Sequence, residues 1–304
     1  MPADFILKMA SKNSSSSFDF DVCMSTYSRV FQPDVLNNKV AFITGGGSGI
    51  CFTIAEVFMR HQCDTVIASR NLQRVEQAAK KLEAATGRRC MPVQLDVRKP
   101  QDVLRGVDEA LGHFGKIDIL VNGAAGNFLA PASGLSFNGF KTVIEIDTLG
   151  TFNTSKAVYD KYMKIHGGVI INISATLAYR GQLFQVHASA AKAAIDSMTK
   201  SLCNEWGAQG IRVVGIAPGP IADTEGMRKL GGAALNEQDM DRAFRNLPLQ
   251  RLGTKCDIAD CAVFAVSTAA SYISGHTIVV DGGCWMTDDN NMDAVIKRLG
   301  NSKL

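Results

Sequence analysis

Paired cysteines are missing from this sequence. Its 304 residues include eight cysteines, but no two of them form the C-x-x-C spacing typical of zinc and redox motifs. The first residues also lack the basic and then apolar pattern of a secretory leader. We therefore expect free thiols in a reducing compartment, with neither disulfides nor a metal site.

Long apolar runs and charge of one sign are also missing. No uncharged apolar stretch approaches the roughly 20 residues that a bilayer requires, so we expect no membrane span. The formal net charge is only +3, and no Lys/Arg stripe runs along any segment. Binding to a nucleic-acid backbone is therefore not expected.

The two ends of the chain have little that would form a core. Residues 1–35 include the serine-rich stretch SKNSSSSFDFD and are expected to form a flexible tail. Residues 286–304 form the predicted C-terminal tail, which ends in Ser302-Lys303-Leu304. This tripeptide matches the signal that the peroxisomal import receptor binds and predicts location in the peroxisomal matrix. The alternative is a frayed end without a signal.

Between the two tails, short β-branched runs alternate with longer helical stretches. The runs include KVAFIT, DTVIAS, IDILVN, GVIINIS and HTIVVD, and one long helical region is expected over residues 137–165. This alternation is typical of an α/β fold, a Rossmann-like doubly wound parallel sheet of about seven strands with helices on both faces. We expect one domain over residues 36–285, interrupted at about 222–250 by a segment that resembles an active-site lid.

A glycine-rich loop, TGGGSGIC, follows the first expected strand. Glycines allow the backbone to approach a pyrophosphate, and the first N–H groups of the next helix point toward its charge. This position in a βαβ series predicts a nicotinamide dinucleotide site. Its expected residues are Gly45, Gly46, Gly47, Ser48, Gly49 and Ile50.

The end of the second strand predicts which dinucleotide binds. An acid about 20 residues after the loop would accept the ribose 2′-hydroxyl of NAD, but Ser69 and Arg70 stand there, with Arg74 one turn later. Guanidinium groups attract a 2′-phosphate, so NADPH is expected. The alternative for the arginines is simple solvation. Asp96 and Val97 end the third strand, where they are expected to bind the adenine of the cofactor: Asp96 accepts from its amino group and Val97 packs on its ring. Asp96 is equally suited to a turn that caps the next helix.

Five motifs occur in a characteristic order: TGGGSGI, LVNGAAG, NIS, the lysine of HASAAK, and IAPGP. Together they resemble the short-chain dehydrogenase/reductase family over residues 36–285. Within the family, AAGNF, IDTLGTFN and the SKL terminus resemble the peroxisomal members that reduce 2,4-dienoyl-CoA with NADPH in the oxidation of polyunsaturated fatty acids. The resemblance also implies a homo-oligomer, a dimer or tetramer.

The resemblance implies roles for further residues. Asn122, Gly123 and Ala124 match the segment that shapes the sheet beside the cofactor. Lys192 matches the lysine that binds the nicotinamide ribose. Four residues match the turn that receives the carboxamide and its continuation: Pro218, Gly219, Ile221 and Thr224.

Three positions depart from the family pattern. Cys51 replaces the last glycine of the loop, where its side chain is expected to weaken packing or cofactor affinity. Ala175 stands at the family serine in an ungapped comparison. Ala188 replaces the family tyrosine, four residues before Lys192. Without the tyrosine, ketone reduction lacks a proton donor.

Reduction of a conjugated dienoyl thioester does not require that phenol, because the proton goes to carbon. Such a site requires a polar group that stabilises the negative charge on the thioester oxygen, and a source of protons. Lys192 is the candidate for the first, and Asp147, where most of the family has asparagine, for the second. Asp147 either passes a proton through water or only holds backbone and water in place. Tyr179 either reaches the site or packs at an edge, and His187 is expected to face outward or to line the approach of CoA.

The acyl-CoA substrate is expected to meet an apolar slot with a basic rim. The resemblance implies Arg98, Phe128, Ser136, Phe137, Asn138 and Lys229 as its contacts, with a lid over residues 227–235. A solvent-facing or core role is the alternative for each. Two other functions compete: an NADP-binding subunit or scaffold without catalysis, and a 3-oxoacyl or enoyl reductase, which the missing tyrosine disfavours.

Overall fold

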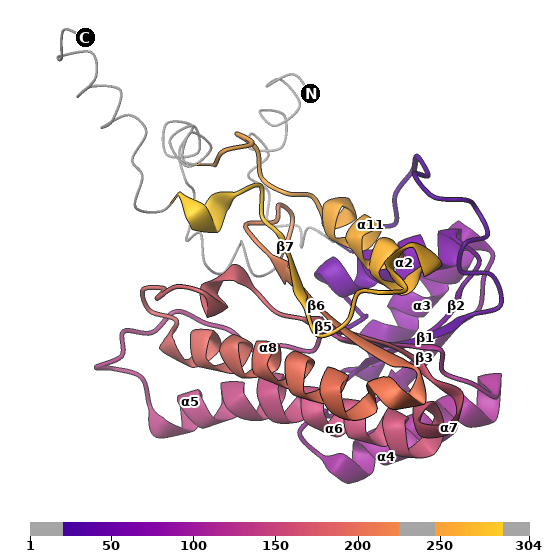
Figure 1. Ribbon diagram of the computed structural model, residues 1–304, viewed down its shortest axis with the longest axis horizontal. Coiled ribbons are helices and arrows are strands. Elements are labelled where there is room, and N and C mark those ends of the chain that lie inside the picture. Colours follow the sequence, from indigo (N-terminus) through magenta and orange to yellow (C-terminus); the bar gives the residue numbers. More distant parts are fainter. Residues whose placement is uncertain (1–20, 225–246, 288–304) are drawn as a thin grey trace, which may run out of the picture.

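Seven parallel strands form a single sheet in the order β3-β2-β1-β4-β5-β6-β7. The computed structural model describes residues 21–224 and 247–287, and Figure 1 shows the sheet running through the middle of the molecule. The strands are β1 (Val40–Thr44), β2 (Asp64–Ser69), β3 (Cys90–Gln94), β4 (Ile119–Asn122), β5 (Gly168–Ile173), β6 (Ile211–Pro218) and β7 (Thr277–Val280). The predicted doubly wound sheet of about seven strands is confirmed.

Helices cover both faces of this sheet (Figure 1). One face packs against α2 (Gly49–Arg60), α3 (Leu72–Thr86) and α11 (Lys255–Val266). The other packs against α4 (Pro100–Phe114), α6 (Gly150–Val158) and α8 (Val186–Trp206). The shorter elements are α5 (Phe137–Val143), α7 (Lys164–His166), the π-helical η1 (Ile144–Leu149) and η2 (Tyr159–Met163), and the 3₁₀ turns η3 (Thr176–Ala178), η4 (Gly207–Gln209), η5 (Thr268–Ala270) and η6 (Cys284–Met286).

Strand β1 illustrates why the strands are apolar throughout. All five of its residues are buried. Ala41 and Ile43 enter the core beneath α2 and α11, while Phe42 enters the opposite core beneath α4 and α6. Side chains alternate between the two faces of a strand, so a sheet covered on both sides requires apolar residues at every position.

The long helical region predicted over residues 137–165 is present as α5, η1, α6, η2 and α7, which follow one another without a break from Phe137 to His166. Two π-helical turns interrupt its α-helical geometry. Such turns frequently occur at functional sites. The first, η1, contains the candidate residue Asp147.

The N-terminal segment differs from the prediction. Residues 21–35 were expected in a flexible tail, but Met24, Tyr27 and Phe31 pack against the core. The Tyr27 hydroxyl donates to Oδ1 of Asp260 on α11 at 2.7 Å. The predicted tail is therefore too long, because residues 21–35 pack on the core. Although this segment has few branched aliphatic residues, its aromatic rings, the Met24 thioether and its polar contacts hold it there.

Several predicted features lie outside the described residues. They are the first part of the N-terminal tail, the lid over residues 227–235 with Lys229, and the terminal Ser302-Lys303-Leu304. Within the two described ranges, no helix has the length and apolar character needed to cross a bilayer.

Candidate active site

The predicted cofactor residues meet at the carboxyl edge of the sheet. Strand β1 lies between β2 and β4. The chain runs outward from β1 through β2 to β3 on one side and continues with β4 on the other side, so the strand order reverses at β1. In open α/β sheets, ligands bind at the carboxyl ends of the strands where the strand order reverses. The loop after β1 lies at this point, between the ends of β2 and β4.

The glycine loop leaves no room for a side chain at its first two glycines. Gly45 has a φ of +72°, and a Cβ there would lie 2.8 Å from the Gly123 carbonyl oxygen. A Cβ at Gly46 would lie 2.7 Å from Cγ2 of Ile67. Ser48, the residue before α2, makes no side-chain cap, so its hydroxyl leaves the N–H donors of the first turn to other acceptors. This cradle fits the pyrophosphate of a dinucleotide.

Basic residues follow β2 as predicted. The Asn71 side chain caps α3 by accepting from the Arg74 N–H at 3.0 Å. A Cβ at Gly47 would lie 3.6 Å from Cγ of Arg74, so the stem of Arg74 runs beside the glycine loop. Arg70 is exposed, and Ser69 is half-buried at the end of β2. The structure thus brings Arg74 to the phosphate loop.

Asp96 and Arg98 form a bidentate ion pair after β3. Nη2 of Arg98 lies 2.6 Å from Oδ2 of Asp96, and Nε lies 3.0 Å from Oδ1. Hydrogen bonds from the guanidinium lower the pKa of Asp96, and those to the carboxylate raise the pKa of Arg98. Asp96 also accepts from the Arg98 backbone N–H at 3.1 Å, which is the geometry of a turn residue before α4.

Val97 is buried against the long helical region. A Cβ at Gly150 would lie 2.6 Å from Cγ2 of Val97, so glycine permits this close approach. The Asn153 amide donates to the Val97 carbonyl at 2.9 Å. The motif IDTLGTFN therefore joins the end of β3 to the helix that contains Asp147.

Asp147 and Lys192 form a buried ion pair. Their Oδ2 and Nζ atoms are 3.0 Å apart, and the two residues are 1% and 9% exposed. Oδ1 of Asp147 accepts from the Gly126 N–H at 2.6 Å, and Nζ of Lys192 donates to the Ile173 carbonyl at 3.0 Å. The pair thus connects η1, the loop after β4, the end of β5 and α8. The sequence indicated both residues but not their contact, nor the part played by Gly126.

The position of the missing tyrosine is occupied by a small buried side chain. Ala188 is 2% exposed and lies one turn before Lys192 on α8. The Tyr179 ring packs 5.4 Å from that of Trp285, and burial raises the pKa of Tyr179 to about 12. This packing favours an edge role for Tyr179 over replacement of the lost phenol.

His187 does not face outward. It is fully buried, and its ring lies 4.4 Å from that of Phe128. The expected outward orientation is wrong because residues 127 and 128 pack on this part of α8: Asn127 also donates to Gln185 at 3.0 Å. Burial lowers the pKa of His187 below its ordinary value of 6.5.

A pH dependence of stability follows. Folded His187 stays neutral under conditions in which the unfolded chain takes up a proton, so the free energy of unfolding should decrease as the pH falls below 6.5. Urea unfolding at pH 7 and pH 5 measures this loss, which is at most about 1.4 kcal/mol per pH unit for one group. His187→Gln should reduce the dependence of the free energy of unfolding on pH. If wild type and variant lose the same stability between pH 7 and pH 5, His187 is not the group responsible.

Asn122 belongs to a buried network beneath the site. Its amide nitrogen donates to Ser155 and Asn172, both at 2.9 Å, and its oxygen accepts from Thr154. Asn172 donates in turn to Thr199 at 2.9 Å. Both amide hydrogens of Asn122 are used here, so the residue shapes the site by tying β4 and β5 to α6 and α8.

Cys51, one of the departures from the family pattern, lies against Gly123 in the structure. Cys51 is 5% exposed, and a Cβ at Gly123 would lie only 2.0 Å from its Sγ. The thiol therefore occupies the space that a side chain at position 123 would need. Burial raises the pKa of Cys51 to about 12, which keeps it a thiol. Cys51 was expected to weaken packing or cofactor affinity; the glycine at position 123 accommodates its side chain in the packing, and an effect on cofactor affinity stays a prediction.

The turn after β6 is held by close contacts. A Cβ at Gly219 would lie 2.4 Å from Cβ of Asp281, and the Gly219 N–H donates to Val280 at 3.0 Å. Ile221 is 3% exposed in the core, and Thr224 donates to its carbonyl at 3.0 Å. Pro218 ends β6 beside Val280 of β7.

Some of the predicted substrate residues lie together. Ser136 caps α5 by accepting from the Gly139 N–H at 3.0 Å, and a Cβ at Gly139 would lie 3.2 Å from Cζ of Phe128. Phe128 is 39% and Phe137 99% exposed. Asn138 is exposed as well. Phe128 therefore lies between the start of α5 and the ring of His187, while Arg98 remains paired with Asp96.

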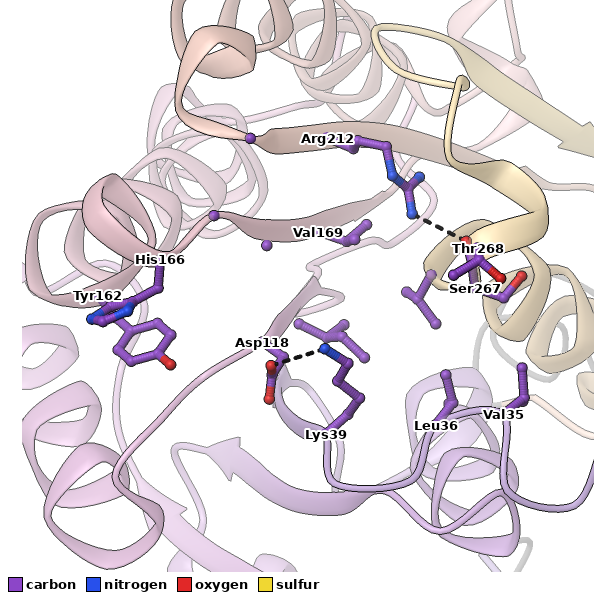
Figure 2. Close-up of a pocket in the computed structure, with 15 residues that line it drawn as sticks. Val35, Leu36, Lys39, Asp118, Tyr162, His166, Val169, Arg212, Ser267 and Thr268 are labelled. Atoms are coloured by element: carbon purple, nitrogen blue, oxygen red, sulfur yellow. Dashed lines mark hydrogen bonds and ion pairs between the residues drawn. The ribbon is translucent and has the colours of Figure 1, made fainter.

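A separate cavity lies at the opposite edge of the sheet (Figure 2). It has a volume of about 270 Å³, and its lining includes residues that precede β1, β4 and β6. Lys39 and Asp118 form an ion pair of 3.2 Å across it, and Arg212 donates to the Ser267 carbonyl at 3.4 Å. Because ligands of this fold bind at the carboxyl edge, the cavity is not the predicted site.

The strand order, the glycine cradle and the buried lysine together define a dinucleotide-binding oxidoreductase of the doubly wound class. The family described as enoyl-(acyl carrier protein) reductase matches residues 45–285. The chain belongs to the short-chain dehydrogenase/reductase family.

Its relatives cover nearly the whole chain. It is 57% identical over 284 residues to the peroxisomal 2,4-dienoyl-CoA reductase of Danio rerio. The aligned region covers 93% of this chain and 94% of the relative. The corresponding protein of Arabidopsis thaliana is 46% identical, covering 86% and 89%. A crystal structure of a short chain dehydrogenase from Bacillus anthracis is 38% identical, with a TM-score of 0.72 and coverage of 81% and 96%.

Proposed function

We propose that this protein is an NADPH-dependent reductase that converts 2,4-dienoyl-CoA to 3-enoyl-CoA. The observation that carries the proposal is the buried Asp147–Lys192 pair, one helical turn from an alanine where the family has its tyrosine. Relatives named as peroxisomal 2,4-dienoyl-CoA reductases, described as (3E)-enoyl-CoA-producing, support the same activity.

The nature of the substrate explains why Ala188 is compatible with activity. When bound, the reduced nicotinamide supplies a hydride. A conjugated thioester spreads the resulting negative charge to its carbonyl oxygen and is then protonated on carbon. A phenol placed to protonate a carbonyl oxygen is therefore unnecessary, whereas a fixed positive charge near that oxygen is useful.

Lys192 is suited to that role. Its ammonium is held between the Asp147 carboxylate and the Ile173 carbonyl, 3.0 Å from each. An ammonium has three donors, so one remains for the ribose hydroxyls or the substrate. Asp147 fixes Lys192 and, through Gly126, the loop that leads to Phe128. Of its two predicted roles, these contacts support holding the site in place, and proton delivery through water remains the alternative.

The residues around the glycine loop favour a phosphorylated cofactor. Arg74 lies beside the loop, Arg70 is exposed, and no carboxylate of β2 is available to a ribose hydroxyl. NADPH is thus the proposed cofactor. Phe128 and the start of α5 would line the acyl-CoA entrance, with Arg98 at its rim and Lys229 outside the described residues.

The domain organisation, cellular location and assembly of the protein are proposed from its sequence. Residues 36–285 would form one catalytic domain. Ser302-Lys303-Leu304 would be bound by the import receptor and deliver the protein to the peroxisomal matrix, in agreement with relatives named peroxisomal. A homo-oligomer is proposed from the family resemblance.

The decisive experiment is the oxidation of NADPH by the purified full chain with 2,4-hexadienoyl-CoA. Absorbance at 340 nm should fall, and the product should be a 3-enoyl thioester. Crotonyl-CoA and acetoacetyl-CoA, which test for enoyl and 3-oxoacyl reduction, should give little turnover. A constant absorbance with measurable NADPH binding would instead support a non-catalytic subunit.

A further inference from the structure

A carboxylate from the N-terminal segment lies inside the predicted phosphate site. Oδ1 of Asp21 accepts from the Gly49 N–H at 2.8 Å, and its Oδ2 lies 3.1 Å from Nη2 of Arg74. Gly49 is the first residue of α2, and Arg74 is the basic side chain beside the glycine loop. Asp21 thus contacts two groups that are predicted to receive the negative charge of the cofactor.

Contacts that do not involve its carboxylate hold Asp21 in this place. Nζ of Lys81 donates to the Asp21 backbone carbonyl at 3.1 Å. The Met24 N–H donates to Glu56 at 2.9 Å, and Arg60 donates to the Met24 carbonyl at 2.7 Å. The segment is therefore fixed to α2 and α3, which lie side by side above the sheet in Figure 1.

Electrostatics makes the carboxylate and a phosphate mutually exclusive here. A helix N-terminus and a guanidinium both stabilise a nearby anion, whether it is a carboxylate or a phosphate. Two anions at the same donors repel each other, so one must leave before the other binds. The Asp21 carboxylate therefore lies where a phosphate of the cofactor is expected to bind.

We propose that Asp21 is a determinant of cofactor affinity and selectivity: it competes with the 2′-phosphate of NADPH for Arg74, while its contact with the Gly49 N–H holds the carboxylate beside that guanidinium. The inference rests on the proposed cofactor site. A carboxylate at this position disfavours the 2′-phosphate and has little effect on a ligand that has only a 2′-hydroxyl. The apparent Kd for the phosphorylated ligand equals its intrinsic Kd divided by the fraction of molecules in which Asp21 has left Arg74.

Calorimetric titration of the full chain with 2′,5′-ADP and 5′-AMP tests this, because the two ligands differ only in the 2′-phosphate. Asp21→Asn keeps the side-chain size and the backbone carbonyl bound by Lys81, but removes the charge. It should bind 2′,5′-ADP about three- to tenfold more tightly than wild type and 5′-AMP within about twofold. Asp34→Asn, at an exposed residue of the same segment, removes the same charge and should change neither affinity.

Unchanged or weaker binding of 2′,5′-ADP by Asp21→Asn would overturn the inference and assign Asp21 to holding Arg74 in place for the ligand. Equal gains in Asp21→Asn and Asp34→Asn would also overturn it, because the effect would then be one of net charge. If wild type binds neither NADPH nor 2′,5′-ADP, the proposed function fails together with the inference. Thermal unfolding of each variant confirms that it is folded.

Discussion

Lys192→Met is expected to lower kcat/KM for 2,4-hexadienoyl-CoA by about 100-fold or more, because the positive charge that we propose lies near the thioester oxygen is lost. The same change leaves Asp147 as a buried charge without its lysine, since Asp147 is only 1% exposed. Removal of one partner of a buried ion pair costs about 3–5 kcal/mol. Steady-state kinetics and urea unfolding measure the two effects.

A second substitution separates catalysis from folding. Lys192→Met combined with Asp147→Asn removes both charges, so stability should return toward the wild-type value while kcat/KM stays low. Lys200→Met, at an exposed residue of the same helix, is the control and should leave both quantities unchanged. Near-normal turnover in a folded Lys192→Met protein would contradict the role of the lysine.

Asp147→Asn alone distinguishes the two roles of the carboxylate. An asparagine oxygen still accepts from the Gly126 N–H, so the loop should keep its position, whereas no carboxyl group remains to pass a proton. If Asp147 mainly holds the site, kcat should fall modestly and show the same dependence on pH. A large loss of kcat with an altered pH profile would assign it to proton delivery.

Gly123→Ala is the second substitution with a large expected effect. Its Cβ would lie 2.0 Å from Sγ of Cys51 and 3.1 Å from the Thr44 carbonyl oxygen. Overpacking of this kind costs about 1–3 kcal/mol. Urea unfolding should therefore show a lower midpoint, with an unchanged slope.

Most of this cost should be relieved when the thiol is removed, because only the 3.1 Å approach to the Thr44 carbonyl oxygen remains tight. In a Cys51→Ala background the nearest side-chain atom is Cβ of residue 51, at 3.5 Å, which is ordinary contact. A double-mutant cycle should thus give a coupling energy of about 1–3 kcal/mol. Gly112→Ala, at an exposed position of α4 with nothing within 4 Å, should instead stabilise the protein. Additive effects of the two core substitutions would show that Cys51 and Gly123 are independent.

Features that depend on residues close together in the chain could be predicted from the sequence. Alternating β-branched runs and helices predicted the seven-stranded parallel sheet, and TGGGSGIC after the first run predicted the cradle at Gly45 and Gly46. Lys192 and Ala188 could be placed on one helix because residues four apart lie on the same face. Each of these patterns is contained within one or two adjacent elements.

The tertiary structure alone decided which distant residues meet. Asp147 touches Lys192 across 45 positions only because η1 and α8 pack together, and Cys51 fits only because Gly123 leaves space for it. His187 was expected to face outward or to line the approach of CoA; it does not face outward, because Phe128 packs against its ring and the residue is buried. Asp21, in a stretch predicted to be a tail, reaches the phosphate loop. Contacts of this kind depend on how helices and loops pack on the sheet, which the spacing of residues along the chain does not encode.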